Sequence, residues 1–83
     1  MKKICAVSLT TIDQVKRFPV IASQYESDIL LCHDKYTIDG TSLMGIISLN
    51  LSSPIDVCMV EKCEGDAERF VEQLKQEGFE VTV

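Results

Sequence analysis

Hydrophobic residues follow two different periods along this chain, and each period predicts its own elements. Alternating or short continuous apolar runs predict β-strands at residues 3–9, 29–32, 36–39 and 55–61. Residues 33–35 form the expected turn between the second and third strands, which makes these two a hairpin. A further short strand is possible at residues 79–83.

A spacing of three or four residues predicts two amphipathic helices. The first covers residues 12–23, after Thr10 or Thr11 as the capping residue, and Pro19 within it predicts a kink or a later start. The second follows Gly65 or Asp66 and stops near Gly78. The expected buried positions of the two helices are Ile12, Val15, Phe18, Ala22 and Tyr25, and Ala67, Phe70, Val71 and Leu74.

A third, shorter helix is expected after the cap signal of Thr41 and Ser42, and Gly40 frees the backbone for the turn into it. Nearly every position that follows is apolar, from residue 43 to residue 49. A short helix cannot turn all of these side chains toward one core, so some of them should be exposed and form a docking surface. We assign Leu43, Met44 and Ile47 to that surface, with additional core as the alternative.

The element order is βαββαβα, which is typical of an α+β fold. A mostly antiparallel sheet with helices on one face, an open-faced β-sandwich, is the expected architecture. The chain has 83 residues, enough for one domain (1–83) with an adequate core and with no linker or repeat.

Charge and hydropathy narrow the choice of partners. Thirteen acidic and eight basic residues give a net charge of −5 with no basic stripe, which argues against nucleic acid. The apolar run near the N-terminus stops at Ser8, and no stretch is long enough to cross a membrane. We therefore expect a cytoplasmic protein whose partners are other proteins.

The four cysteines do not form a Cys-x-x-Cys motif. We expect reduced thiols that behave as small hydrophobic residues, and neither a metal nor another cofactor. A zinc site of Cys32, His33, Cys58 and Cys63 is disfavoured because neighbouring residues on a strand point to opposite faces. A disulfide is the remaining alternative. His33, the only histidine, is expected to be a solvated turn residue.

Residues 42–49 read Ser-Leu-Met-Gly-Ile-Ile-Ser-Leu. This sequence resembles the second-helix motif Ser-[Leu/Ile]-Met-Gly-[Ile/Val]-x-Ser-Leu of HPr, the histidine phosphocarrier family of bacterial sugar phosphotransferase systems. The resemblance extends over about residues 15–79 and is strongest over 22–49. It implies an HPr-like open-faced sandwich with the sheet order 1-4-2-3, and the short central helix fits HPr better than a ferredoxin-like fold.

The chain departs from the family at the phosphocarrier motif His-x-Arg-Pro. Residues 8–17 contain no histidine, and the loop is about four residues shorter than the family requires. Alignment backwards from residue 22 places Thr11 and Asp13 at the histidine and arginine positions, and alignment forwards from the first strand places Gln14 and Lys16 there. Phosphocarrier chemistry needs an imidazole at a helix N-terminus, so we expect no histidine phosphocarrier activity and no enzyme.

Ser42 matches the serine that an ATP-dependent kinase phosphorylates in Gram-positive members of the family. The resemblance therefore implies a regulatory or adaptor protein of sugar transport regulation, with Ser42 as a phosphoserine candidate and a serine kinase or transcriptional regulator as partner. Ser42 would cap the helix in either case. Two alternatives stay open: a divergent phosphocarrier with Thr11 or Ser42 as acceptor, and a structural or assembly domain with no phosphotransfer role.

Strand alternation also sorts the two faces of the sheet. The residues expected to face the helices are Cys5, Val7, Ile29, Leu31, Val57 and Met59. Those expected on the outer face are Ile4, Ala6, Leu30, Cys32, Cys58 and Val60. An apolar outer face is unusual, so we expect a second copy to cover it in a homodimer. The alternatives are that residues 79–83 fold back near this face, or that the strand register is shifted by one residue.

Overall fold

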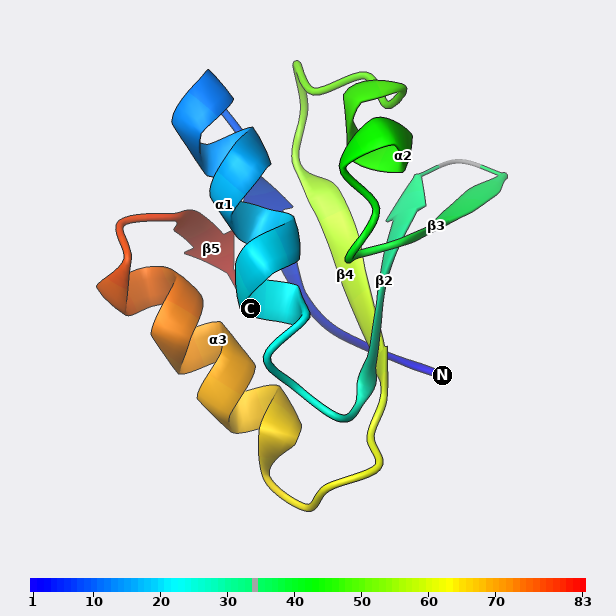
Figure 1. Ribbon diagram of the computed structural model, residues 1–83, viewed down its shortest axis with the longest axis vertical. Helices are drawn as coiled ribbons and strands as arrows, with labels where there is room; N and C mark the ends of the chain where they lie inside the picture. Colours follow the sequence, from blue (N-terminus) through cyan, green and yellow to red (C-terminus); the bar gives the residue numbers. More distant parts are fainter. Residues whose placement is uncertain (34) are drawn as a thin grey trace.

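The computed structural model describes residues 1–33 and 35–83, and it has the α+β architecture that the sequence predicts. The elements in chain order are β1 (Lys2–Ser8), α1 (Ile12–Ala22), β2 (Asp28–His33), β3 (Tyr36–Asp39), α2 (Leu43–Ile47), β4 (Ile55–Val60), α3 (Asp66–Gln76) and β5 (Glu80–Thr82). Figure 1 shows α1 and α3 side by side, with α2 beside the β2–β3 hairpin. The three helices and the sheet are compatible with an open-faced sandwich.

The sheet has five strands in the order β3-β2-β4-β1-β5, and each neighbouring pair is antiparallel. The predicted order 1-4-2-3 is therefore not the order of this sheet. Read from the β1 side, those four strands are neighbours as predicted, but β5 pairs with the other edge of β1 and extends the sheet by one strand. The chain reaches that edge because it reverses after α3, where Gly78 adopts a positive φ of 87°.

The hairpin between β2 and β3 lies where it was predicted. His33 is not a turn residue, however, because it ends β2 and pairs with Tyr36 in the register of the two strands. Residue 34 of the expected turn lies outside the described residues.

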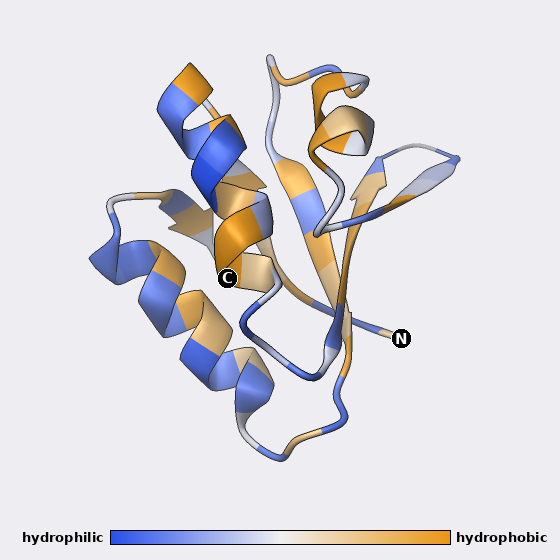
Figure 2. Ribbon diagram, in the orientation of Figure 1, coloured by the Kyte–Doolittle hydropathy of each residue, from blue (hydrophilic) through white to orange (hydrophobic). Residues whose placement is uncertain are grey.

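The core forms between the inward side of the sheet and the helices. The six strand residues predicted to face the helices are all buried. Phe18 of α1 is fully buried and meets Phe70 of α3 edge to face, with ring centroids 5.7 Å apart. Phe79 packs on Phe18 in the same way at 6.3 Å. Figure 2 shows the resulting mixture of apolar and polar positions along α1 and α3.

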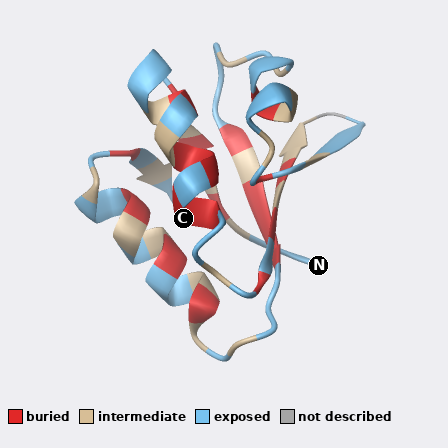
Figure 3. Ribbon diagram, in the orientation of Figure 1, coloured by how far each residue is buried: buried red, intermediate tan, exposed pale blue. Residues whose placement is uncertain are grey.

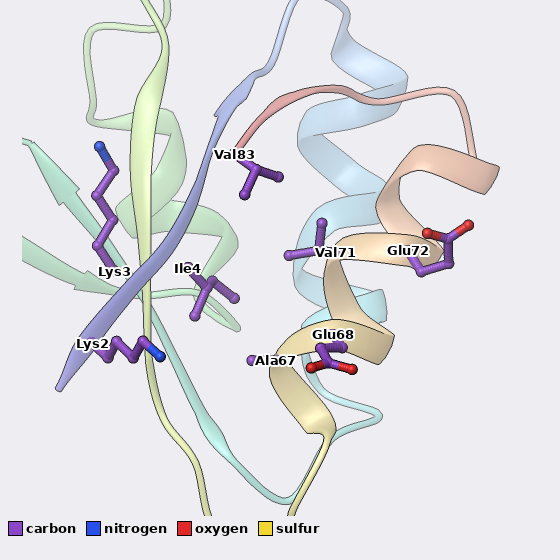
Figure 4. A pocket seen from close by; sticks show the side chains of 8 residues that line it. All are labelled: Lys2, Lys3, Ile4, Ala67, Glu68, Val71, Glu72 and Val83. Carbon is purple, nitrogen blue, oxygen red and sulfur yellow. The ribbon is translucent and has the colours of Figure 1, made fainter.

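The outer face differs from the prediction at Ile4. The pairing of β1 with β4 contains a bulge between Lys3 and Cys5, so the side chains no longer alternate there. Ile4 packs against the core and points toward α3, where it lies opposite Ala67 and Val71 (Figure 4). The prediction that Ile4 faces outward is wrong for this reason.

The rest of the predicted outer face is less apolar than expected. Ala6, Leu30 and Cys32 are half-buried, Val60 is exposed and Cys58 is buried. The ion pair between Lys3 Nζ and Asp56 Oδ1, 3.2 Å long, belongs to the same face, since Lys3 pairs with Cys58 and Asp56 with Ala6. Self-association through this face stays a prediction, on a smaller apolar patch than the sequence indicated.

One buried polar network connects the loop before β2 to the start of α3. The Ser27 hydroxyl donates to Asp66 Oδ2 at 2.8 Å and accepts the backbone N–H of Lys62 at 2.8 Å. The N–H of Cys63 lies 3.4 Å from the same oxygen. The hydrogen bond from Ser27 holds the pKa of Asp66 below its ordinary value of 3.8, with a further contribution from Arg69.

Replacing Ser27 with alanine is expected to lower the free energy of unfolding by about 2 kcal/mol, because the buried carboxylate of Asp66 loses a donor and two part-buried N–H groups lose their acceptor. It should also flatten the pH dependence. The pKa of Asp66 is lowered in the folded state, so its ionisation favours folding above pH 3.8, and this stabilisation is lost as the pH falls through the folded pKa. Urea unfolding at pH 7 and pH 3 measures both effects.

The matched control is Ser23→Ala, since Ser23 is an exposed serine whose hydroxyl donates only to the carbonyl of Val20. It should change the stability by less than about 0.5 kcal/mol. Equal costs for the two substitutions would show that the Ser27 network is not stabilising.

Candidate docking site on helix α2

The short helix α2 is fixed to the domain by its two central residues. Ile46 is fully buried in the core. Gly45 lies so close to β3 that a Cβ atom placed on it would be 2.5 Å from Ile38 Cγ2. These two contacts fix the position of α2 on the domain, although the helix has only five residues.

Ser42 begins this helix as predicted. Its Oγ accepts the backbone N–H of Gly45 at 3.2 Å, which makes Ser42 the N-cap. At the other end, the hydroxyl of Ser48 donates to the Gly45 carbonyl at 2.6 Å. Both flanking serines thus satisfy backbone groups of the helix, and Ser42 itself is half-buried.

The three residues assigned to a docking surface lie on the outside of α2. The exposed fractions are 38% for Leu43, 77% for Met44 and 54% for Ile47. In Figure 2 the helix is largely apolar, whereas in Figure 3 most of it is exposed. These side chains are therefore not additional core, and together with Ser42 they form the α2 surface.

The loop before α2 places a carboxylate beside this surface. Asp39 Oδ1 accepts the backbone N–H of Thr41 at 2.9 Å and its hydroxyl at 2.8 Å. The backbone hydrogen bond from Thr41, together with its hydroxyl, holds the pKa of Asp39 below its ordinary value. The hydroxyl of Thr41 is therefore engaged by a negative charge, unlike that of Ser42.

The N-terminus of α1, where the resemblance would place phosphocarrier chemistry, is capped by side chains of the chain itself. Thr11 Oγ1 accepts the N–H of Gln14 at 3.1 Å, and Gln14 Oε1 accepts the N–H of Thr10 at 2.9 Å. This arrangement resembles a capping box, except that Gln14 reaches the N–H of the residue before the N-cap and not that of the N-cap Thr11 itself. Asp13 pairs with Arg17, with Oδ2 and Nε 2.8 Å apart. Thr11, Asp13 and Gln14 thus have structural partners here.

Ile12 does not lie where the helical spacing predicts. It was expected on the buried face of α1, but 72% of it is exposed. Ile12 is the first residue of the helix, at the end that projects furthest from α3 in Figure 1. It lines a shallow pocket with Leu51 and Thr11. Periodicity marks the face of a residue but not whether the core extends that far along the helix.

The structure also has an apolar groove that the sequence did not predict. It has a volume of about 490 Å³ and lies between β1 and α3, and its lining includes the apolar residues Ile4, Ala67, Val71 and Val83 (Figure 4). The groove exists because the bulge in β1 turns Ile4 toward α3, and alternation along a strand gives no signal of such a bulge.

Among the described residues, no group of three or more histidine, cysteine, aspartate or glutamate side chains is arranged to hold a metal ion. All four cysteines carry free thiols. The four residues of the disfavoured zinc set do not converge: Cys63 lies beside Glu26, with Sγ and Oε2 3.7 Å apart, whereas Cys32 contacts Cys58.

No protein-family model, curated protein or solved structure matches this chain. Within the described part of the chain, no helix is both long and apolar enough to span a membrane.

Proposed function

We propose that this protein is a non-catalytic regulatory or adaptor protein of HPr-like type, which docks on partner proteins through the α2 surface. The observation that carries the proposal is the exposure of Leu43, Met44 and Ile47 on a helix that is otherwise fixed by buried contacts. Exposed apolar side chains that a small domain could have buried are typical of an interaction site. The HPr-like character of the open-faced sandwich is part of this proposal, with β5 as a fifth strand beyond the four that the resemblance implies.

Ser42 is the proposed regulatory site within that surface. A phosphoserine carries about 1.5 to 2 negative charges and would stand directly before Leu43, next to backbone N–H groups of the first turn. The added charge would weaken an apolar docking contact and create a new site for a basic partner. The proposed partners are therefore a serine kinase and a transcriptional regulator in the cytoplasm.

The proposal excludes phosphotransfer at α1. A phosphate at the start of α1 would need backbone N–H groups and a cation. Gln14 Oε1 already accepts the N–H of Thr10. The cation Arg17 is already paired with Asp13 and with Glu77, whose Oε1 lies 3.0 Å from Arg17 Nη1. Sugar transport regulation is the process that the resemblance implies.

Charge substitutions on α2 test the docking role. With the ATP-dependent serine kinase of the family as the probe, Met44→Lys and Ile47→Lys should each lower the rate of Ser42 phosphorylation at least ~10-fold, which corresponds to about 1.4 kcal/mol. The reason is that a lysine would have to be desolvated in an apolar contact. Initial rates of phosphate incorporation, at kinase concentrations well below that of the substrate, give this ratio.

The control is Val20→Lys, an equally drastic substitution at an exposed valine of α1. It should leave the rate within about twofold, as surface substitutions away from a contact normally do. A kinase that is equally insensitive to all three substitutions would refute docking through α2.

A second incubation separates the remaining alternatives. With phosphoenolpyruvate and the general phosphotransfer enzyme, the divergent-phosphocarrier alternative requires label on Thr11 or Ser42, and our proposal requires none. A structural domain would be labelled by neither route.

A further inference from the structure

The outer face of the sheet carries a pair of thiols in contact. Cys32 of β2 and Cys58 of β4 have Sγ atoms 3.2 Å apart. The strands are direct neighbours in the sheet, and both side chains point away from the helices, since their strand neighbours Leu31, Val57 and Met59 form the core. The contact joins residues that are 26 positions apart in the sequence.

We propose that Cys32 and Cys58 are a thiol–disulfide exchange site that reacts with a low-molecular-weight disulfide to form a reversible cross-strand disulfide. This modification site does not depend on the α2 surface or on Ser42.

Access to the two sulfurs is unequal, and this assigns the order of the steps. Cys32 is half-buried, whereas only 8% of Cys58 is exposed. A reagent in solution therefore reaches Cys32 first. Burial raises the pKa of the Cys58 thiol to about 11, with the neighbouring Cys32 thiol as the next cause, so Cys58 presents little thiolate to a reagent in solution. Its Sγ lies 3.2 Å from Cys32 Sγ, and this contact assigns Cys58 to the second, intramolecular step.

The two steps balance as follows. The Cys32 thiolate attacks one sulfur of the reagent, the S–S bond of the reagent breaks, and one thiolate leaves and takes up the proton that Cys32 lost. The Cys58 thiolate then attacks Cys32 Sγ, the mixed disulfide breaks, and the second reagent thiolate leaves and takes up the proton of Cys58. Two electrons pass from the cysteine pair to the reagent, which is released as two thiols.

The register of the strands indicates that the bond would be reduced readily. Cys32 pairs with Asp56 and Cys58 with Leu30, so the two cysteines are diagonal rather than directly opposed. Diagonal neighbours have Cα atoms about 7–8 Å apart, whereas disulfides usually span at most about 6.8 Å. Closing the bond must therefore draw β2 toward β4, and β2 has only the short edge strand β3 on its other side.

The other two cysteines are less suited to this reaction. Cys5 lies in the core and is only 2% exposed, so a reagent in solution does not reach it. Cys63 is half-buried near the surface, but its pKa is raised first by the carboxylate of Glu26 and then by that of Asp66. A carboxylate beside a thiol disfavours the reactive thiolate.

Glutathione disulfide is the probe for the test. The reduced full chain is incubated with an excess of it, remaining thiols are alkylated after unfolding, and intact mass and peptide mapping identify the products. The expected product is a monomer that has lost two hydrogen atoms, joins Cys32 to Cys58, and carries alkyl groups on Cys5 and Cys63 only. As the ratio of glutathione to glutathione disulfide is raised, the Cys32–Cys58 bond should be reduced and all four cysteines should again be free thiols.

Single substitutions then assign the roles. Cys58→Ser should accumulate a glutathionyl group on Cys32, because the resolving thiol is absent. Cys32→Ser should lose most of the reaction at this face, and Cys63→Ser should form the disulfide as the parent does. A parent that stops at a glutathionyl adduct, pairs Cys63, or forms only intermolecular bonds overturns the proposal.

Discussion

Replacing Phe18 with alanine is expected to lower the free energy of unfolding by about 4 kcal/mol. The side chain is fully buried and contacts two other rings edge to face, Phe70 at 5.7 Å and Phe79 at 6.3 Å. Its removal leaves a cavity between α1, α3 and the segment entering β5. The total free energy of unfolding of a domain is about 5–15 kcal/mol, so this loss is a large part of it. The Phe18→Ala variant should therefore unfold at a much lower urea concentration than the parent.

Val20→Ala is the control on the same helix. Val20 is exposed, so the substitution should change the stability by less than about 0.5 kcal/mol. Urea unfolding followed by circular dichroism compares the two variants. A loss below about 1 kcal/mol for Phe18→Ala would mean that α1 and α3 are not packed as described.

Gly45→Val is expected to cost about 3 kcal/mol, through overpacking between α2 and β3. The Cβ alone would lie 2.5 Å from Ile38 Cγ2 and 3.2 Å from Ser42 Oγ, and the two methyl groups of valine add to that clash. The β-branched Ile38 has little freedom to move aside. Either α2 shifts away from β3 or the domain loses stability.

The matched control is Met44→Val, one position earlier on the same helix. Met44 is exposed, so valine there should cost only its lower helix propensity, about 0.5 kcal/mol. Denaturation midpoints of the two valine variants give the comparison. If Gly45→Val were no more destabilising than Met44→Val, α2 would not be seated against β3.

Most of the fold follows from local pattern. The inward strand residues, the caps at Thr11 and Ser42, and the strand Tyr36–Asp39 could be predicted because each depends on neighbours a few positions away. The direction of the Ile4 side chain could not be predicted, because the bulge depends on the pairing of β1 with β4. Ile12 could not be placed either, because helix periodicity contains no information on where the core ends.

The candidate site was predictable in part for a simple reason of size. A helix of five residues cannot turn all four of its apolar side chains toward one core, so exposure of some was expected, and Ile46 proved to be the buried one. The position of Gly45 against Ile38 and the contact between Cys32 and Cys58 needed the tertiary structure. These contacts join segments whose spacing in the sequence has no periodic signal.

The position of the phosphate after incubation with ATP and the family's serine kinase tests the central claim most directly. Tandem mass spectrometry should find one phosphate, on Ser42, and the Ser42→Ala protein should remain unlabelled. That variant loses a cap worth about 1 kcal/mol, so its fold is checked by circular dichroism. Thr41 is the informative neighbour, because its hydroxyl lies 2.8 Å from Asp39 Oδ1 and a phosphate there would meet a carboxylate. Phosphate on Thr41, Ser48 or Thr11, or equal labelling of Ser42→Ala and the parent, would contradict a regulatory α2 surface.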